Sequence, residues 1–187
     1  MLSSAVASLA LAALSQAPSA RMLSVDPAKS TVTYAIVHKL HKVNAESRSV
    51  EGKAALLPEG KLQVMVRAPV SSFKSGDANR DEHMQETLET SKYSHVIFKA
   101  AGQVTPPATF PATTELSLPG QLEFHGRKRM ETVTLKLEWA SAGEVRVKTS
   151  FTVSLDAYEV ERPSLLLIKI DDGCVIGADL VLREDGK

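Results

Sequence analysis

Apolar and polar side chains alternate along much of the chain with a period of two, the pattern of a β-strand that buries one face. It is clearest over residues 132–139, where apolar side chains alternate with threonine, lysine and glutamate. Residues 145–155 repeat it after a turn at Ala142-Gly143. These two segments predict a long hairpin.

The same alternation predicts further strands over residues 31–38, 49–57, 61–68, 96–104, 114–124 and 175–182, and an apolar run at 165–170 predicts another. Pro58-Glu59-Gly60 predicts a hairpin turn, and the prolines of residues 105–111 predict a stiff loop. Pro119 and Gly120 interrupt their strand, which suggests an edge strand or a bulge.

One segment has the features of a short helix. Asn79 is a candidate N-cap with Glu82 three residues later, as in a capping box, and Asp81 lies in the favourable first turn. Met84 and Leu88 are four residues apart, so they share an apolar face that is expected to dock on the rest of the protein.

About eight strands and one helix favour an all-β fold, an antiparallel barrel or sandwich, over an alternating α/β arrangement. The interior of an eight-stranded barrel can be packed solid or can hold one small ligand. Aromatic residues make up only 5% of the chain, so a cavity would be walled mainly by aliphatic side chains.

The first twenty residues carry no charged side chain. Their apolar run, residues 5–14, would form a helix of about 15 Å, half of a bilayer core near 30 Å, so stable membrane insertion is not expected. Small residues follow at 15–20 and offer a cleavage site. We interpret residues 1–20 as a signal peptide for export to the periplasm or beyond, and residues 21–187 as one domain; a buried N-terminal helix is the alternative.

Charge and cysteine content exclude several classes of protein. Lys and Arg number 22, as do Asp and Glu, so no general attraction to nucleic acid is expected. Cys174 is the single cysteine, which excludes an intramolecular disulfide and suggests a buried thiol.

Candidate chemistry is sparse. His38 and His41 are three residues apart, but a zinc site needs further ligands, and His83, His95 and His125 would serve only if the fold brought them together. There is no Gly-x-Ser-x-Gly nucleophile motif, and the adjacent acidic pairs would point to opposite faces of a strand. We therefore expect no enzyme activity, no metal and no cofactor.

A basic cluster at residues 127–129 is expected to form a turn. With Lys39 and Lys42 it could meet a phosphate or pyrophosphate if these side chains flanked the mouth of a barrel. The alternative is a solvated hairpin tip, since charged turns are ordinary.

Four segments, in this order and spacing, resemble the YceI-like family: Asp26-Pro27 with the strand that follows, residues 79–83, residues 93–99, and residues 122–126. The resemblance covers roughly residues 25–182. It implies a lipocalin-like antiparallel barrel, export, and a polyisoprenoid or similar amphiphile in the lumen, without catalysis.

From the inward-facing positions we expect the ligand to contact a set of lumen residues, with its polar head near His38. One alternative is a packed, secreted interaction or stress-response module with Trp139 and Phe151 filling the lumen, and another is a quinone- or redox-linked accessory protein. The protein is expected to be a monomer or homodimer. The expected lumen residues are Val32, Tyr34, Ile36, His38, Val64, Phe98, Phe124, Leu135, Trp139 and Phe151.

Overall fold

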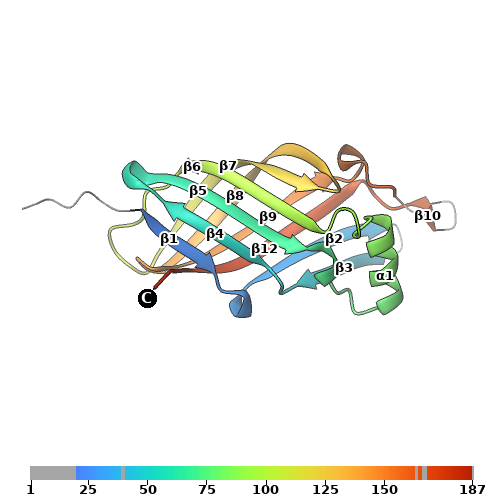
Figure 1. Ribbon diagram of the computed structural model, residues 1–187, viewed down its shortest axis with the longest axis horizontal. Helices are drawn as coiled ribbons and strands as arrows, with labels where there is room; N and C mark the ends of the chain where they lie inside the picture. Colours follow the sequence, from blue (N-terminus) through green and yellow to red (C-terminus); the bar gives the residue numbers. More distant parts are fainter. Residues whose placement is uncertain (1–19, 39–40, 163, 166–167, 187) are drawn as a thin grey trace, which may run out of the picture.

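The computed structural model describes residues 20–38, 41–162, 164–165 and 168–186, most of which lie in antiparallel strands (Figure 1). The expected signal peptide, apart from Ala20, lies outside the described residues. The strands are β1 (Arg21–Val25), β2 (Thr31–His38), β3 (His41–Ser47), β4 (Glu51–Leu56), β5 (Lys61–Pro69), β6 (His95–Gln103), β7 (Ala112–Phe124), β8 (Arg127–Ser141), β9 (Glu144–Ser154), β10 (Ser164–Leu165), β11 (Ile168–Lys169) and β12 (Gly173–Glu184). One α-helix, α1 (Ala78–Thr87), and four short 3₁₀ turns, η1 (Pro27–Lys29), η2 (Pro58–Gly60), η3 (Val70–Ser72) and η4 (Asp156–Tyr158), complete it.

Eight strands close into a barrel in the order β1-β4-β5-β6-β7-β8-β9-β12, with β12 returning to pair with β1. The antiparallel barrel that the alternation and the family resemblance predicted is confirmed. Closure turns the apolar faces of the eight strands toward one interior.

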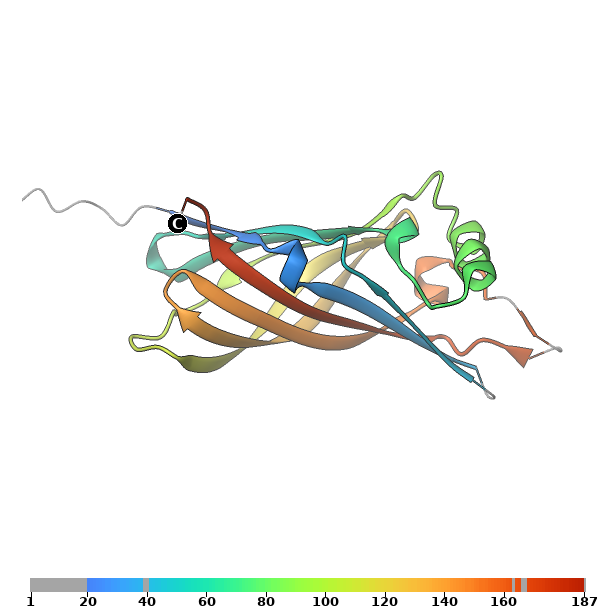
Figure 2. The same cartoon turned by 90° about the horizontal axis from the view of Figure 1, so that it is seen from below.

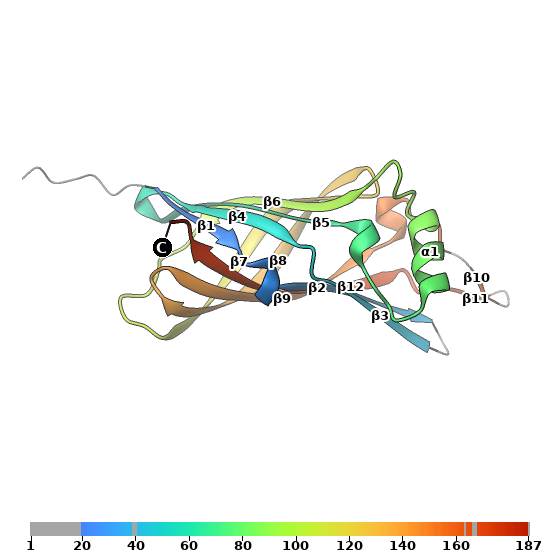
Figure 3. The same cartoon turned by 60° about the horizontal axis from the view of Figure 1, so that its bottom comes forward.

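Different strands complete the barrel wall at its two ends, because β1 and β2 pair with different parts of the same edge of β12. Near its C-terminal end β12 pairs with β1, at Leu182 to Glu184, and nearer its start it pairs with β2, at Cys174 to Asp179. The turn η1 separates β1 from β2. The hairpin β2–β3 therefore extends past the closed barrel toward the end where α1 lies (Figures 2 and 3).

The predicted strands are found except for the one at residues 165–170, and β1 and β3 are strands that the sequence analysis did not predict. No bulge interrupts β7 in its pairing with β8 from Ala112 to Phe124, but residues 112–119 have no described partner on the β6 side, so this half of the strand is an edge as Pro119 suggested. Its ladder with β6 ends at Gly120. Pro119 lacks a backbone N–H, and it falls where β6 no longer needs a donor from β7.

The run at residues 165–170 is not a strand of the barrel, so that prediction is wrong. Its described residues form a separate two-stranded sheet, β10–β11, which projects beyond the barrel near α1 (Figure 1). Strands β9 and β12 already pair directly, from Gly173 with Ser154 onward. The intervening segment consequently has no place in the wall.

The helix begins two residues earlier than its sequence indicated. Asp77 is the N-cap, and its carboxylate accepts a hydrogen bond from the Arg80 backbone N–H at 3.0 Å. Asn79 is therefore inside the helix, and the expected capping box with Glu82 is not formed. Asp77 and Asn79 are both short polar residues of the kind preferred as N-caps, and Asp77 has the extended backbone that the position requires.

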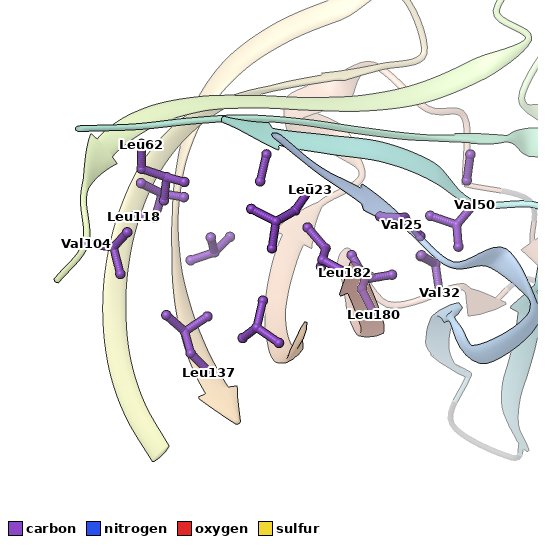
Figure 4. Packing of buried hydrophobic residues seen from close by; sticks show 14 of the residues in the cluster. Leu23, Val25, Val32, Val50, Leu62, Val104, Leu118, Leu137, Leu180 and Leu182 are labelled. Carbon is purple, nitrogen blue, oxygen red and sulfur yellow. The ribbon is translucent and has the colours of Figure 1, made fainter. Parts of the chain in front are cut away.

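Aliphatic side chains from opposite walls meet in the closed half of the barrel. Leu23, Leu118 and Leu182 are each at most 5% exposed, and Figure 4 shows them pointing into the same interior. The Trp139 indole N–H donates a hydrogen bond to the Thr114 hydroxyl at 3.0 Å, so this buried ring keeps its polar atom satisfied. No helix in the described ranges has the length and apolar character to cross a bilayer.

Candidate ligand-binding cavity

The barrel encloses two adjoining cavities. An inner cavity of about 180 Å³ lies in the closed half, and an outer cavity of about 480 Å³ lies beneath α1. Both are lined by the same four residues, Phe73, Val96, Leu122 and Ile176, which we call the waist. A molecule long enough to pass the waist would occupy both cavities.

The inner cavity offers an apolar lining contributed by all eight barrel strands. Its two polar lining residues have partners elsewhere: the Arg67 guanidinium binds Glu51, and the Thr149 hydroxyl donates to the Thr134 carbonyl at 2.8 Å. Among the residues that the structure describes, no unpaired polar side chain lines this space. The inner cavity therefore suits hydrocarbon alone.

Close packing around the waist depends on Gly120. A Cβ atom at this position would lie only 2.4 Å from Cζ of Phe98, so the missing side chain makes room for the phenyl ring. Phe98 lies opposite Leu122 in the β6–β7 ladder. A larger residue at 120 would displace the ring and change the lumen.

The outer cavity has a barrel wall and a helical cover. Tyr34 and Ile36 of β2, Phe124 of β7 and Cys174 of β12 belong to the wall. The cover is one face of α1 and its C-cap, formed by residues three or four apart, so they lie one above another. This cover face comprises Arg80, His83, Met84, Thr87 and Leu88.

A buried carboxylate holds the start of α1 in place. Asp81 accepts hydrogen bonds from the Ser75 backbone N–H at 2.9 Å and from the Ser75 hydroxyl at 2.6 Å. These bonds, led by the hydroxyl, lower the pKa of Asp81. Lys74, the residue before Ser75, forms two backbone hydrogen bonds with Glu46 of β3, at 2.8 and 3.0 Å. These bonds tie the segment before the helix to the β2–β3 hairpin.

The other side of the outer cavity is held by η4. Tyr158 is fully buried and its hydroxyl donates to Glu131 at 2.8 Å; burial first, and this bond second, raise its pKa. His125 lies in a two-residue hairpin turn with Gly126, both at positive φ, and its Nδ1 lies 3.1 Å from the Tyr158 carbonyl. These contacts fix the segment that brings Val160 and Arg162 to the cavity.

Two titratable groups of the outer wall are kept neutral by burial. The pKa of the Tyr34 phenol is raised to about 12, chiefly by burial, and that of the Cys174 thiol is also raised to about 12 by burial. The Tyr34 hydroxyl makes no hydrogen bond within the described part of the chain. It is therefore a spare hydrogen-bond donor on the cavity wall.

Nine of the ten expected lumen residues line the two cavities. Val32, Val64, Phe98, Leu135, Trp139 and Phe151 line the inner cavity, and Tyr34, Ile36 and Phe124 line the outer one. His38 ends β2 opposite His41, and its side chain lies outside the described part. Contact of these residues with a ligand stays a prediction.

The cover face of α1 was the main feature that sequence reasoning missed. The spacing of Met84 and Leu88 indicated a docking face, but the same 3.6-residue period also places Arg80, His83 and Thr87 on it. Extending the period to polar residues would have found them.

The basic cluster lines neither cavity, so the condition for a phosphate site at the mouth is not met, and the alternative of a solvated surface cluster is favoured. Its residues belong to β8 rather than to a turn, and their partners lie on the outer surface: Arg127 pairs with Glu159, Lys128 with Glu123, and Arg129 with the Ala157 carbonyl. Lys42 is exposed on β3 and lines neither cavity, and Lys39 lies outside the described residues.

The fold does not gather the histidines. His83 lies on α1, His95 at the start of β6 and His125 in the β7–β8 turn. Within the described ranges, no group of three His, Cys, Asp or Glu side chains could hold a metal ion.

Comparison with known proteins links this architecture to a family. A family model described as the YceI-like domain matches residues 23–182. No curated protein sequence matches the chain.

Three solved structures share the fold. A polyisoprenoid-binding domain from Saccharophagus degradans, implicated in plant cell wall breakdown, is 16% identical with a TM-score of 0.72, over 87% of this chain and 98% of that one. BcnA from Burkholderia cenocepacia is 18% identical with a TM-score of 0.67, over 84% and 98%. The YCEI protein from Campylobacter jejuni is 12% identical with a TM-score of 0.59, over 81% and 90%.

Proposed function

This chain belongs to the YceI-like family, and from that premise we propose that it binds a polyisoprenoid or similar long-chain amphiphile within its barrel and carries or sequesters it without catalysis. The observation that supports this most directly is the pair of adjoining cavities, the inner one walled by aliphatic and aromatic side chains from every strand of the barrel. Removing a hydrocarbon chain from water into such a space is favourable by roughly 25 cal/mol per Å² of apolar surface.

The alternative of a solidly packed module fits the interior less well. It expected Trp139 and Phe151 to fill the lumen, yet both line the inner cavity, and the outer cavity of about 480 Å³ is within the usual size range of ligand pockets. The hypothesis of a redox-linked protein gains no specific observation from the geometry.

Export is part of the same proposal. It is supported by the uncharged, Ala- and Leu-rich residues 1–20 and by the small residues that close them. Expression of the full chain in a Gram-negative host should give a periplasmic protein whose intact mass corresponds to cleavage near residue 17 or 20. An uncleaved protein confined to the cytoplasm would contradict export while leaving the binding proposal untouched.

Ligand binding is tested by native mass spectrometry and lipid extraction of the protein purified from the periplasm. We expect a co-purifying hydrophobic molecule, or uptake of an added polyprenyl compound. Ala178→Phe places a phenyl ring in the inner cavity and should abolish uptake of long chains.

The matched control is Ala101→Phe, because Ala101 is exposed on the outside of β6. It should leave uptake unchanged. Equal uptake by the wild type and by a folded Ala178→Phe variant would place the ligand outside the inner cavity, and no uptake by the wild type would defeat the proposal.

A further inference from the structure

The cover face of α1 is unusually polar for a helix that closes an apolar space. Helices of globular proteins normally turn an apolar stripe inward. Here three of the five residues on the cover face, Arg80, His83 and Thr87, are polar. The Arg80 and His83 side chains are 45% and 64% exposed, so water satisfies their polar groups in the ligand-free protein, and a bound head group would replace that water.

Arg80 has donors to spare. Its guanidinium forms a single long ion pair, 3.7 Å from the Asp77 carboxylate, and makes no side-chain hydrogen bond within the described part of the chain. Every other arginine in that part donates at least one hydrogen bond: Arg21, Arg48, Arg67, Arg127, Arg129, Arg146, Arg162 and Arg183.

Tyr34 presents a second spare donor from the barrel wall. Its hydroxyl has no partner among the described residues, and Tyr34 and Arg80 line the same outer cavity, the tyrosine from β2 and the arginine from α1. A group bound in this cavity can therefore meet both donors.

Among the side chains that the structure describes around the outer cavity, Arg80 is the cation without a hydrogen-bonded partner. Arg162 is held by two short bonds to Asp156, and Asp81 is directed at Ser75. Glu161 lines the cavity from an exposed position after η4, and the His83 ring makes only a 3.7 Å contact with Glu86.

We propose that Arg80, assisted by His83 and the Tyr34 hydroxyl, binds the anionic head of the amphiphile, a carboxylate or a phosphate, beneath α1. A guanidinium is suited to both heads because each presents two oxygens to its paired donors. The tail then passes the waist into the inner cavity, which holds no polar partner for a head. This inference rests on the proposed binding function.

Three probes with the same sixteen-carbon chain separate the head from the tail: hexadecyl phosphate, hexadecanoic acid and hexadecanol. Affinity is measured by displacement of N-phenyl-1-naphthylamine, an uncharged fluorophore. Loss of a charged hydrogen bond makes Arg80→Gln about tenfold to a hundredfold weaker for an anionic probe, while hexadecanol binding stays unchanged.

Arg48→Gln is the matched control, since Arg48 is 72% exposed and lines neither cavity. Weakening of both anions supports a general anion site, and weakening of one anion identifies its head as the ligand chemistry. If Arg80→Gln leaves both anions unchanged, or weakens the alcohol equally, the head site is wrong although lipid binding stands. If the wild type binds none of the probes, the binding function itself fails.

Trp139 supplies an independent measure of orientation. It is the single tryptophan of the chain and lines the inner cavity. A bromine at the tail end of hexadecanoic acid should quench its fluorescence, and a bromine at carbon 2 should not. The reverse order of quenching would mean that the head lies in the inner cavity, and would overturn the proposal.

Discussion

At the scale of single residues, Asp81 is the ionisable group that most directly holds α1 over the outer cavity. Its side chain is 8% exposed and joins α1 to Ser75 in the preceding loop. A buried carboxylate is stable only while its oxygens keep their donors. The position of Arg80, one residue earlier on the helix, therefore depends on this contact.

We expect Asp81→Asn to lower the free energy of unfolding at pH 7 by about 1–3 kcal/mol, because a charged acceptor of two hydrogen bonds is replaced by a weaker neutral one. The pKa of Asp81 is lowered in the fold, so its contribution is present above the unfolded value near 3.9 and is lost as pH falls through the folded value. Urea denaturation at several pH values measures both effects.

The difference between wild type and Asp81→Asn should consequently shrink below about pH 4, where the carboxyl of the unfolded chain begins to bind a proton, and should vanish once the folded carboxyl is protonated as well. Asp77→Asn is a useful comparison, because asparagine is also a good N-cap and should preserve the helix start. A difference that stayed constant down to pH 2 would show that Asp81 acts through packing rather than charge.

Much of the cavity wall could be predicted residue by residue. Strand alternation placed Val32, Leu135 and Phe151 on the inward face, and they line the inner cavity. Arg80 was not predicted, because only the apolar residues Met84 and Leu88 were used to define the docking face of α1. The helical period that joins them also places Arg80 on that face.

At the scale of elements, α1 is held by few contacts compared with the strands it covers. Its attachments are the bonds from Asp81 to Ser75, the backbone pair between Lys74 and Glu46, and the apolar side chains Met84 and Leu88. Elements with few buried contacts open at low free-energy cost. Opening of α1 would give the ligand a route into the outer cavity.

Hydrogen exchange tests this difference between elements. Amides of α1 should exchange faster than those of β8 and β9, which pair with each other and with further strands on both sides. A bound amphiphile should slow exchange in α1 more than in β8. Equal protection of α1 and β8 in the ligand-free protein would contradict a mobile cover.

Local sequence signals were reliable for strands with a clear apolar alternation, but β1 and β3 were not predicted, and the connections were predicted less well. The hairpin of β8 and β9 was predicted because its alternation and its turn agree. The helix start was misplaced by two residues because Asp77 and Asn79 are both good caps. The segment at 165–170 was misassigned because an apolar run does not reveal that its neighbours already pair with each other.

At the scale of the whole molecule, the closed half holds the smaller cavity and the outer half holds the larger one. The closed half contains side chains that are almost fully buried, such as Leu118 at 1% exposure and Val133 at 2%. The outer half contains the larger cavity, whose cover carries polar groups. Empty space contributes no packing energy, so the closed half should supply most of the free energy of folding.

We expect Leu118→Ala to lower the free energy of unfolding by about 2–5 kcal/mol, as for other fully buried leucines. Leu88→Ala should cost less, below about 1.5 kcal/mol, because Leu88 is only half buried and already borders a cavity. Trp139 fluorescence during urea denaturation measures both variants. A larger loss for Leu88→Ala would reverse this assignment of the two halves.

The turn η1 separates β1, which closes the barrel, from the β2–β3 arm, although both β1 and β2 pair with the same edge of β12. Since β1 alone completes the ring, the length and course of the β2–β3 arm can change without reopening it. Engineering or natural divergence can therefore change the entrance of the outer cavity to suit another ligand while the closed barrel stays intact. Grafting a different arm between η1 and Arg48 would be the place to begin.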